Sequence, residues 1–107
     1  MDIYDPNGKK YEGSQDDILA KYASDIKDAK KRTIKKTVLR NGIFVSTVWL
    51  GINHSFGNNV LIYETMVFDG VDTFNEIDVT RYGTREEAKK GHTKMAHKYS
   101  RKKILKR

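Results

Sequence analysis

The sequence lacks cysteine altogether and contains a single proline in 107 residues. Without cysteine, disulfides, thiolate catalysis and cysteine-based zinc sites are excluded. No apolar run approaches the roughly 20 residues that a membrane span needs, and the first ten residues lack the apolar segment of a secretory signal. We therefore expect one domain, residues 1–107, in the cytoplasm, with no membrane partner and no cofactor or metal.

Positive charge is concentrated toward the C-terminus. Residues 1–28 hold four Lys against seven Asp and Glu, a net charge of −3, whereas residues 85–107 hold ten Lys and Arg against two Glu, a net charge of +8. This basic end predicts nucleic-acid binding about as well as it predicts a solvated helix face followed by a frayed tail over residues 100–107. The candidate nucleic-acid-binding residues are Lys89, Lys90, Lys94, Lys98, Arg101, Lys102 and Lys103.

Two helices are predicted from capping residues and apolar spacing. Ser14 precedes a segment whose apolar residues recur on one helical face, which predicts a helix from about Gln15 to Ala29. Thr84 and Glu87 form a capping box ahead of a second amphipathic pattern. The second helix should pack on one face of a sheet, because a lone four-stranded sheet cannot hide its apolar side.

Four strands are predicted between these helices, over Thr33–Arg40, Ile43–Leu50, Val60–Phe68 and Glu76–Tyr82. Asn41-Gly42 favours a two-residue hairpin loop that would pair Arg40 with Ile43, and in the next pair we expect Leu50 opposite Val60. The predicted fold class is α+β, a four-stranded antiparallel meander with an N-terminal and a C-terminal amphipathic helix packed on it.

The central hairpin carries apolar residues on both of its faces. One row is Phe44, Ser46, Val48 and Leu50 with Val60, Ile62, Glu64, Met66 and Phe68. The other row is Val45, Thr47 and Trp49 with Leu61, Tyr63, Thr65 and Val67. Both faces should therefore be covered, either by one helix each or by an interface, for which a homodimer is one option.

Glu64 lies in the first of these rows, where a carboxylate needs a partner or takes up a proton. In the predicted register Ser46 and Lys35 share its face and are the candidate partners. A structural glutamate with satisfied hydrogen bonds is the favoured interpretation. A general acid or base is the competing one.

His54 falls in a polar loop and His92 on the apolar face of the second helix. An ordinary loop histidine and a core histidine are the favoured interpretations, because neither residue belongs to a GxSxG or HExxH motif. His54, Glu64 and His92 remain weak catalytic candidates.

Trp49 and Tyr63 could stack on nucleobases, but their aliphatic neighbours favour core packing. If they are exposed instead, they form a candidate interaction surface together with His54 and Phe56.

Three segments of the chain match a pattern that joins V-S-T-V-W-L-G-x-D-H, F-E-T-M-V-F and R-Y-x-T-x-E-E-A-x-x-G-H. The matching positions are Val45 to Gly51, His54, Glu64 to Phe68, Arg81 to Tyr82, Thr84, Glu86 to Ala88 and Gly91 to His92. In this pattern the chain resembles a family of small proteins encoded by phages, prophages and plasmids. Asn53 replaces the expected Asp and Tyr63 the expected Phe, which argues against an acid-dependent role at residue 53. The resemblance implies origin from a mobile genetic element and a bacterial host, but no activity.

Three functions compete on these grounds. The first is a non-enzymatic binding or regulatory protein that acts on a host or phage protein, with counter-defence as one setting. The second is a nucleic-acid-binding protein that uses the basic C-terminal helix. The third is a small hydrolase or nucleotide-ligand-binding protein that needs His54, Glu64 and His92 to converge.

Overall fold

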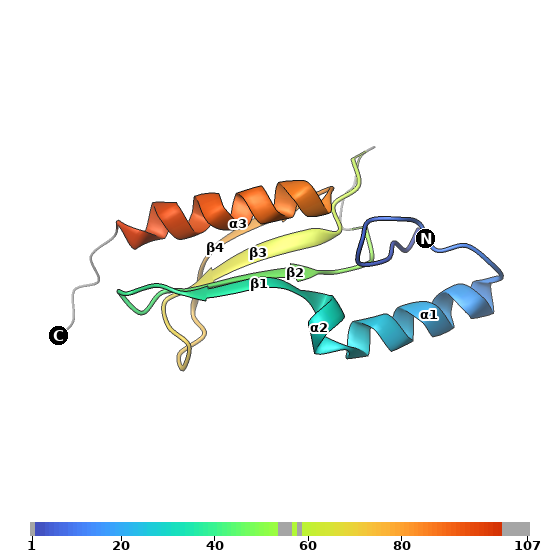
Figure 1. The fold of residues 1–107 in the computed structure, drawn as a ribbon, viewed down its shortest axis with the longest axis horizontal. Helices are drawn as coiled ribbons and strands as arrows, with labels where there is room; N and C mark the ends of the chain where they lie inside the picture. The colour runs from blue at the N-terminus through green and yellow to red at the C-terminus, as the bar shows by residue number, and fades with distance from the viewer. Residues whose placement is uncertain (1, 54–56, 58, 102–107) are drawn as a thin grey trace.

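A computed structural model describes residues 2–53, 57 and 59–101 of the chain. Its elements are α1 (Gln15–Lys27), α2 (Ala29–Arg32), β1 (Thr33–Val38), β2 (Phe44–Trp49), β3 (Tyr63–Phe68), β4 (Glu76–Tyr82) and α3 (Arg85–Ser100). The four strands form one antiparallel sheet in the order β1-β2-β3-β4 (Figure 1). The predicted α+β class with a meander sheet is confirmed.

Helix α1 lies beside one end of the sheet (Figure 1). Ser14 caps its first turn, accepting a hydrogen bond from the Asp17 N–H at 3.1 Å, as the sequence predicts. The helix ends at Lys27, two residues before the predicted end, because the Asp28 side chain caps the separate turn α2. Tyr22 joins α1 to the sheet, through a hydrogen bond of 3.2 Å to the Leu50 carbonyl and an edge-to-face contact with Trp49.

The hairpin between β1 and β2 differs from the predicted register by one residue. Val38 pairs with Phe44 and Thr37 with Val45, because the loop has three residues and ends in Gly42, whose φ is +90°. Glycine adopts this left-handed conformation readily, which permits a type I turn followed by a bulge. A shift of one residue exchanges the faces of a strand, so Val38 lies on the opposite side of the sheet from Val45.

The pairing of β2 with β3 differs from the predicted register by two residues, since Trp49 pairs with Tyr63. An even shift leaves every side chain on its expected face because the strand period is two. The two predicted rows of side chains are therefore confirmed within β2 and β3.

Helix α3 covers one of these faces. Thr84 caps it, accepting from the Glu87 N–H at 3.1 Å, and it buries Ala88, His92, Met95 and Tyr99. Met95 and Tyr99 pack against Ile43, Val45 and Val67, while Ala88 packs against Trp49, Ile62 and Tyr63. On the other face α2 contacts β1 and β2 at one end of the sheet, and no helix of the described residues other than α3 contacts β3 or β4 (Figure 1).

Gly91 allows α3 to approach β4 closely. A Cβ atom at this position would lie 2.2 Å from ring atoms of Tyr82, well inside van der Waals contact. The usual helical advantage of alanine over glycine should therefore be reversed here.

We expect Gly91→Ala to lower the free energy of unfolding by about 1–3 kcal/mol, the usual cost of overpacking, measured by urea denaturation. Thr93→Ala, at an exposed position of the same helix, should be neutral or stabilising. A gain in stability for Gly91→Ala would contradict the close contact.

Candidate functional site

His92 lies at the centre of a buried chain of hydrogen bonds. Its Nδ1 is 2.7 Å from the Thr47 hydroxyl and its Nε2 is 2.8 Å from the Thr37 hydroxyl, while Thr47 is 2.5 Å from the Thr65 hydroxyl. The side chain is 1% exposed. Both ring nitrogens are occupied by threonines and shielded from solvent, so the predicted role as a core histidine is confirmed.

Burial lowers the pKa of His92 below its ordinary value, and the nearby Lys35 amine lowers it further. The neutral imidazole fits the threonine chain, since one ring nitrogen donates and the other accepts. Lys35 lies on this face of the sheet, opposite Thr47 in the β1–β2 pair, and not on the face of Glu64 as predicted.

Glu64 points to the other face, where its Oε2 accepts from Arg81 Nε at 2.9 Å across the β3–β4 pair. Arg81 was not among the predicted partners of Glu64, because no register was predicted between these two strands. The carboxylate is 11% exposed and paired, as the structural interpretation of Glu64 expects.

The catalytic constellation predicted for a hydrolase does not form. Glu64 and His92 lie on opposite faces of the sheet, and His54 lies outside the described residues. Among residues 2–53, 57 and 59–101, no group of three His, Asp or Glu side chains could hold a metal ion. No helix of the described part is long and apolar enough to cross a membrane.

Two of the four residues proposed as an interaction surface belong to the core. Trp49 and Tyr63 are each 0% exposed. The Trp49 indole donates to the Tyr4 carbonyl at 3.0 Å, and the Tyr63 hydroxyl donates to the Pro6 carbonyl at 2.8 Å. These rings hold the N-terminal segment on the sheet and cannot contact a partner. Phe56, like His54, lies outside the described residues.

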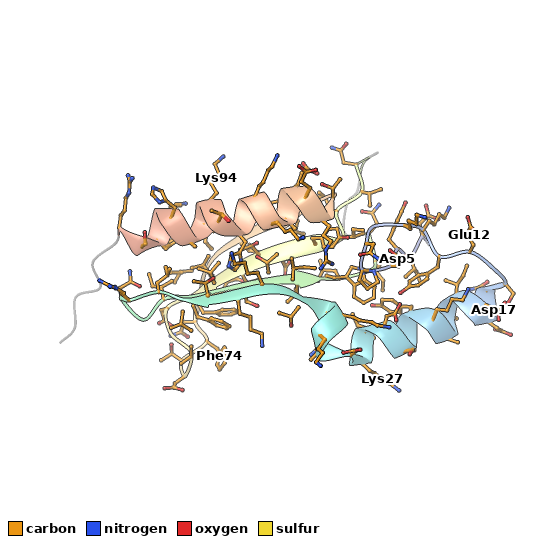
Figure 2. All side chains as sticks on the ribbon, viewed as in Figure 1. Asp5, Glu12, Asp17, Lys27, Phe74 and Lys94 are labelled. Atoms are coloured by element: carbon orange, nitrogen blue, oxygen red, sulfur yellow. The ribbon has the colours of Figure 1, made fainter. Side chains whose placement is uncertain are left out.

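The cations of α3 lie mostly along its solvent side, where Figure 2 labels Lys94. Lys90 is paired with Glu86 at 3.3 Å, and Lys98 with Asp78 at 3.1 Å. The Tyr99 hydroxyl donates to the same carboxylate at 2.7 Å, and this bond is the main cause of the lowered pKa of Asp78. Lys102 and Lys103 lie outside the described residues.

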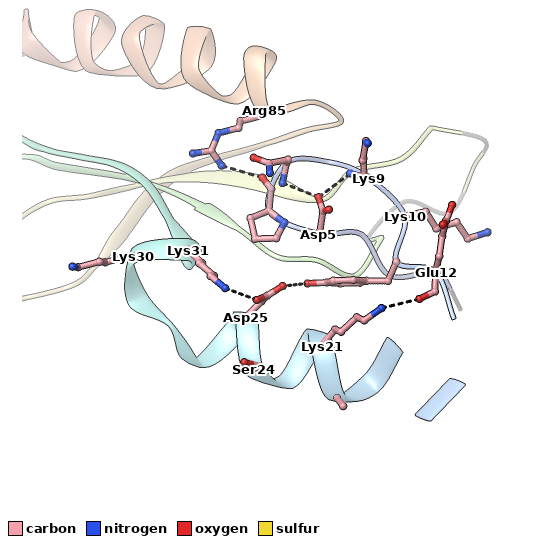
Figure 3. A pocket seen from close by; sticks show the side chains of 14 residues that line it. Asp5, Lys9, Lys10, Glu12, Lys21, Ser24, Asp25, Lys30, Lys31 and Arg85 are labelled. Carbon is pink, nitrogen blue, oxygen red and sulfur yellow. Dashed lines mark hydrogen bonds and ion pairs between the residues drawn. The ribbon is translucent and has the colours of Figure 1, made fainter. Parts of the chain in front are cut away.

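A polar cleft of about 1110 Å³ separates the N-terminal segment from α1 and α2 (Figure 3). Asp25 accepts hydrogen bonds there from the Tyr11 hydroxyl at 2.5 Å and Lys31 Nζ at 2.9 Å, and the Tyr11 bond is the main cause that lowers its pKa. Arg85 Nη1 donates to the Pro6 carbonyl at 3.0 Å. These polar groups bind one another, so they fasten the N-terminal segment in place.

Apolar side chains gather on the sheet face opposite α3, beside the polar Lys36, Ser46 and the Glu64–Arg81 pair, and we call this apolar group the open face. It comprises Val38, Phe44, Met66, Phe68, Phe74, Ile77 and Val79. Val38 is 61% exposed, Phe74 60%, Ile77 46% and Val79 41%. The rings of Phe44 and Phe68 stack, and Phe74 meets Phe68 edge to face at 5.7 Å. The open face is therefore a candidate contact surface.

Phe74 reaches the open face from the loop between β3 and β4, which bends away from α3 (Figure 2). Its φ is +51°, the left-handed region that bulky residues avoid. Asp69 holds the loop by accepting hydrogen bonds from the side chains of Thr73 and Asn75. Phe74 was not predicted as a site residue, although an aromatic residue inside a polar turn is a signal that the sequence offers. Val38 was not predicted because the wrong hairpin register placed it on the opposite face.

The pKa of His92 makes stability depend on pH. Below about pH 6.5 this histidine takes up a proton in the unfolded chain, whereas in the folded chain its lowered pKa disfavours protonation. We therefore expect the free energy of unfolding of the wild type to fall as the pH is lowered from about 7 to 5. Denaturant titrations should show a weaker fall for His92→Gln, while Thr93→Ala, which removes no titratable group from α3, keeps the wild-type dependence. Equal pH dependence in wild type and His92→Gln would contradict the assignment.

Comparisons of the chain with protein-family models, with curated proteins and with solved structures each found no match. Its function is therefore inferred from its own residues.

Proposed function

We propose that the chain is a small non-enzymatic binding protein that recognises a partner protein through the open face. The observation that carries this proposal is the exposure of Val38, Phe74, Ile77 and Val79 on one side of the sheet. Contiguous exposed apolar surface of this kind marks protein interaction sites. Its burial against a partner contributes about 25 cal/mol for each Å² removed from water.

The conformation of Phe74 supports the proposal. A left-handed backbone costs an L-residue about 1–2 kcal/mol, which offsets much of the stability that the edge-to-face contact with Phe68 contributes. The loop nevertheless holds the ring in a position where it stays 60% exposed. Strain of this sort concentrates at positions that serve binding or catalysis.

The ionisable groups of the sheet support a non-enzymatic role. Glu64 is paired with Arg81, and His92 is buried between threonines on the other face. The resemblance to mobile-element proteins supports a host or phage protein as the partner, the cytoplasm of a bacterial host as the location, and counter-defence as the biological setting.

A second candidate function is nucleic-acid binding by α3, which the exposure of Lys89 and Lys94 favours. Such binding would be driven by phosphate contacts and would weaken steeply with salt. The ion pairs of Lys90 and Lys98 already offset part of the charge. Fluorescence anisotropy with labelled DNA and RNA, at low and at about 0.2 M salt, decides this candidate, since no binding at low salt excludes it.

The open face is tested by capture from bacterial lysate, followed by titration of the purified captured protein. We expect Val79→Lys to weaken its affinity at least tenfold, because the substitution places a charge in the apolar contact. Leu19→Lys is the matched control, since Leu19 is an exposed apolar residue on α1, outside the open face. It should retain wild-type affinity. A captured protein that binds both variants equally would contradict the proposal, as would a wild type that captures none.

Phe74→Gly gives a second readout. Relief of the left-handed strain should offset the lost contact with Phe68, so the free energy of unfolding should stay within about 1 kcal/mol of the wild type. Affinity for the partner should fall at least tenfold nonetheless. A large loss of stability with unchanged affinity would show that Phe74 serves the fold alone.

A further inference from the structure

Strand β4 is an outer strand of the sheet, and in the described part of the chain β3 is the strand that it pairs with. The Val79 N–H donates to Asp78 Oδ1 at 2.8 Å, so it points away from β3. Backbone groups alternate along a strand, which directs the N–H and carbonyl of Arg81 to the same outer edge. Within the described residues no other strand meets this edge. Once the Val79 N–H exchanges its bond to Asp78 for one to a partner, this edge can accept an added strand.

A groove of about 550 Å³ runs beside this edge, between β4 and α3. Its floor is formed by Thr80, Tyr82, Gly91 and Met95. Gly91 leaves the Tyr82 ring in direct contact with the helix. Because the Tyr82 ring and Met95 contribute most of the side-chain surface there, the floor is largely apolar. A strand added to β4 would direct every second side chain into this groove.

The helical wall of the groove is basic. Lys94, His97 and Lys98 line it, and no acidic residue does. The nearby Asp78 carboxylate is already bound by Lys98 and Tyr99. This charge favours acidic side chains on the groove side of an added strand.

The other face of the added strand would continue the open face beside Ile77 and Val79. Side chains on that face gain by being apolar, because their neighbours are. The two faces of the site therefore favour different residues, acidic on the groove side and apolar on the other. Because successive side chains of a strand point to opposite faces, acidic and apolar residues should alternate along the bound segment.

We propose that the β4 edge and its groove bind an extended segment of a partner protein in which acidic and apolar residues alternate. The partner adds a strand to the sheet, with its acidic side chains against Lys94 and His97 and its apolar side chains beside Val79. This inference rests on the proposed function as a protein-binding module and names the chemistry of the partner.

A second copy of this chain is the less favoured occupant. Pairing of two β4 edges about a two-fold axis would bring the basic walls of both grooves to the same side of the joined sheet. Their like charges would repel, and each chain carries a net charge of +7. An acidic partner segment meets no such repulsion.

The test uses a labelled six-residue peptide that alternates glutamate and valine, titrated by fluorescence anisotropy against the full chain. We expect saturable binding at physiological salt. A peptide of the same composition with its three glutamates and three valines in separate blocks should bind at least tenfold more weakly. So should an alternating peptide with N-methylated backbone amides, because it cannot donate to the strand edge.

Charge reversal supplies the matched pair of protein variants. Lys94→Glu should weaken the alternating peptide at least tenfold, whereas Lys89→Glu, on the same helix outside the groove, should stay within twofold of the wild type. Equal losses in both variants, equal affinity for the block peptide, or no binding to the wild type would overturn the inference. So would light scattering that shows a stable dimer which Lys94→Glu strengthens.

Phe74→Gly separates this inference from the proposed function. The variant should bind the alternating peptide within twofold of the wild type, because Phe74 does not line the groove. A captured partner that depends on Phe74 and Val79, combined with no peptide binding, would leave the open face standing and remove the β4 site. Peptide binding without any captured partner would leave the β4 site standing and remove the open face as a binding surface.

Discussion

The packing of α3 on one face of the sheet is the constraint on which the rest of the structure depends. The helix is held by apolar contacts at both ends and by the hydrogen bonds of His92 to Thr37 and Thr47 in the middle. Buried polar groups tolerate little displacement, because an unmade hydrogen bond in the interior costs about 1–3 kcal/mol. The position of the helix along the sheet is thereby determined. Helix α3 covers one face, and among the described residues Val38, Phe74, Ile77 and Val79 remain exposed on the other.

The interior ionisable groups and their partners are used for structure. Glu64 is neutralised by Arg81, Asp25 is bound by Tyr11 and Lys31, and Asp78 joins β4 to Tyr99 on α3. The bond of Asp25 to Lys31 joins the neighbouring helices α1 and α2, while the others link separate segments of the chain. The chain has a modest apolar core, and these bonds supplement it.

The open face and the β4 edge, in contrast, are exposed to solvent in the described part of the chain. The open face exposes apolar side chains, the outer edge of β4 presents backbone donors and acceptors, and the groove beside α3 is lined by basic residues. The open face and the β4 edge meet at Ile77 and Val79. A strand bound at the edge would widen the open face, so the two surfaces can serve one partner.

The element types, both helix starts and the division of β2 and β3 into two faces follow from the sequence alone, because capping residues and the periods of 3.6 and 2 are local properties. The β1–β2 register does not, since Asn41-Gly42 suits a loop of either two or three residues, and one residue exchanged the faces of β1. The partner of Glu64 depends on the β3–β4 register, which no local pattern encodes. Which apolar row is buried was decided only when α3 docked. Burial of a face depends on contacts between distant segments, and those contacts exist only in the folded chain.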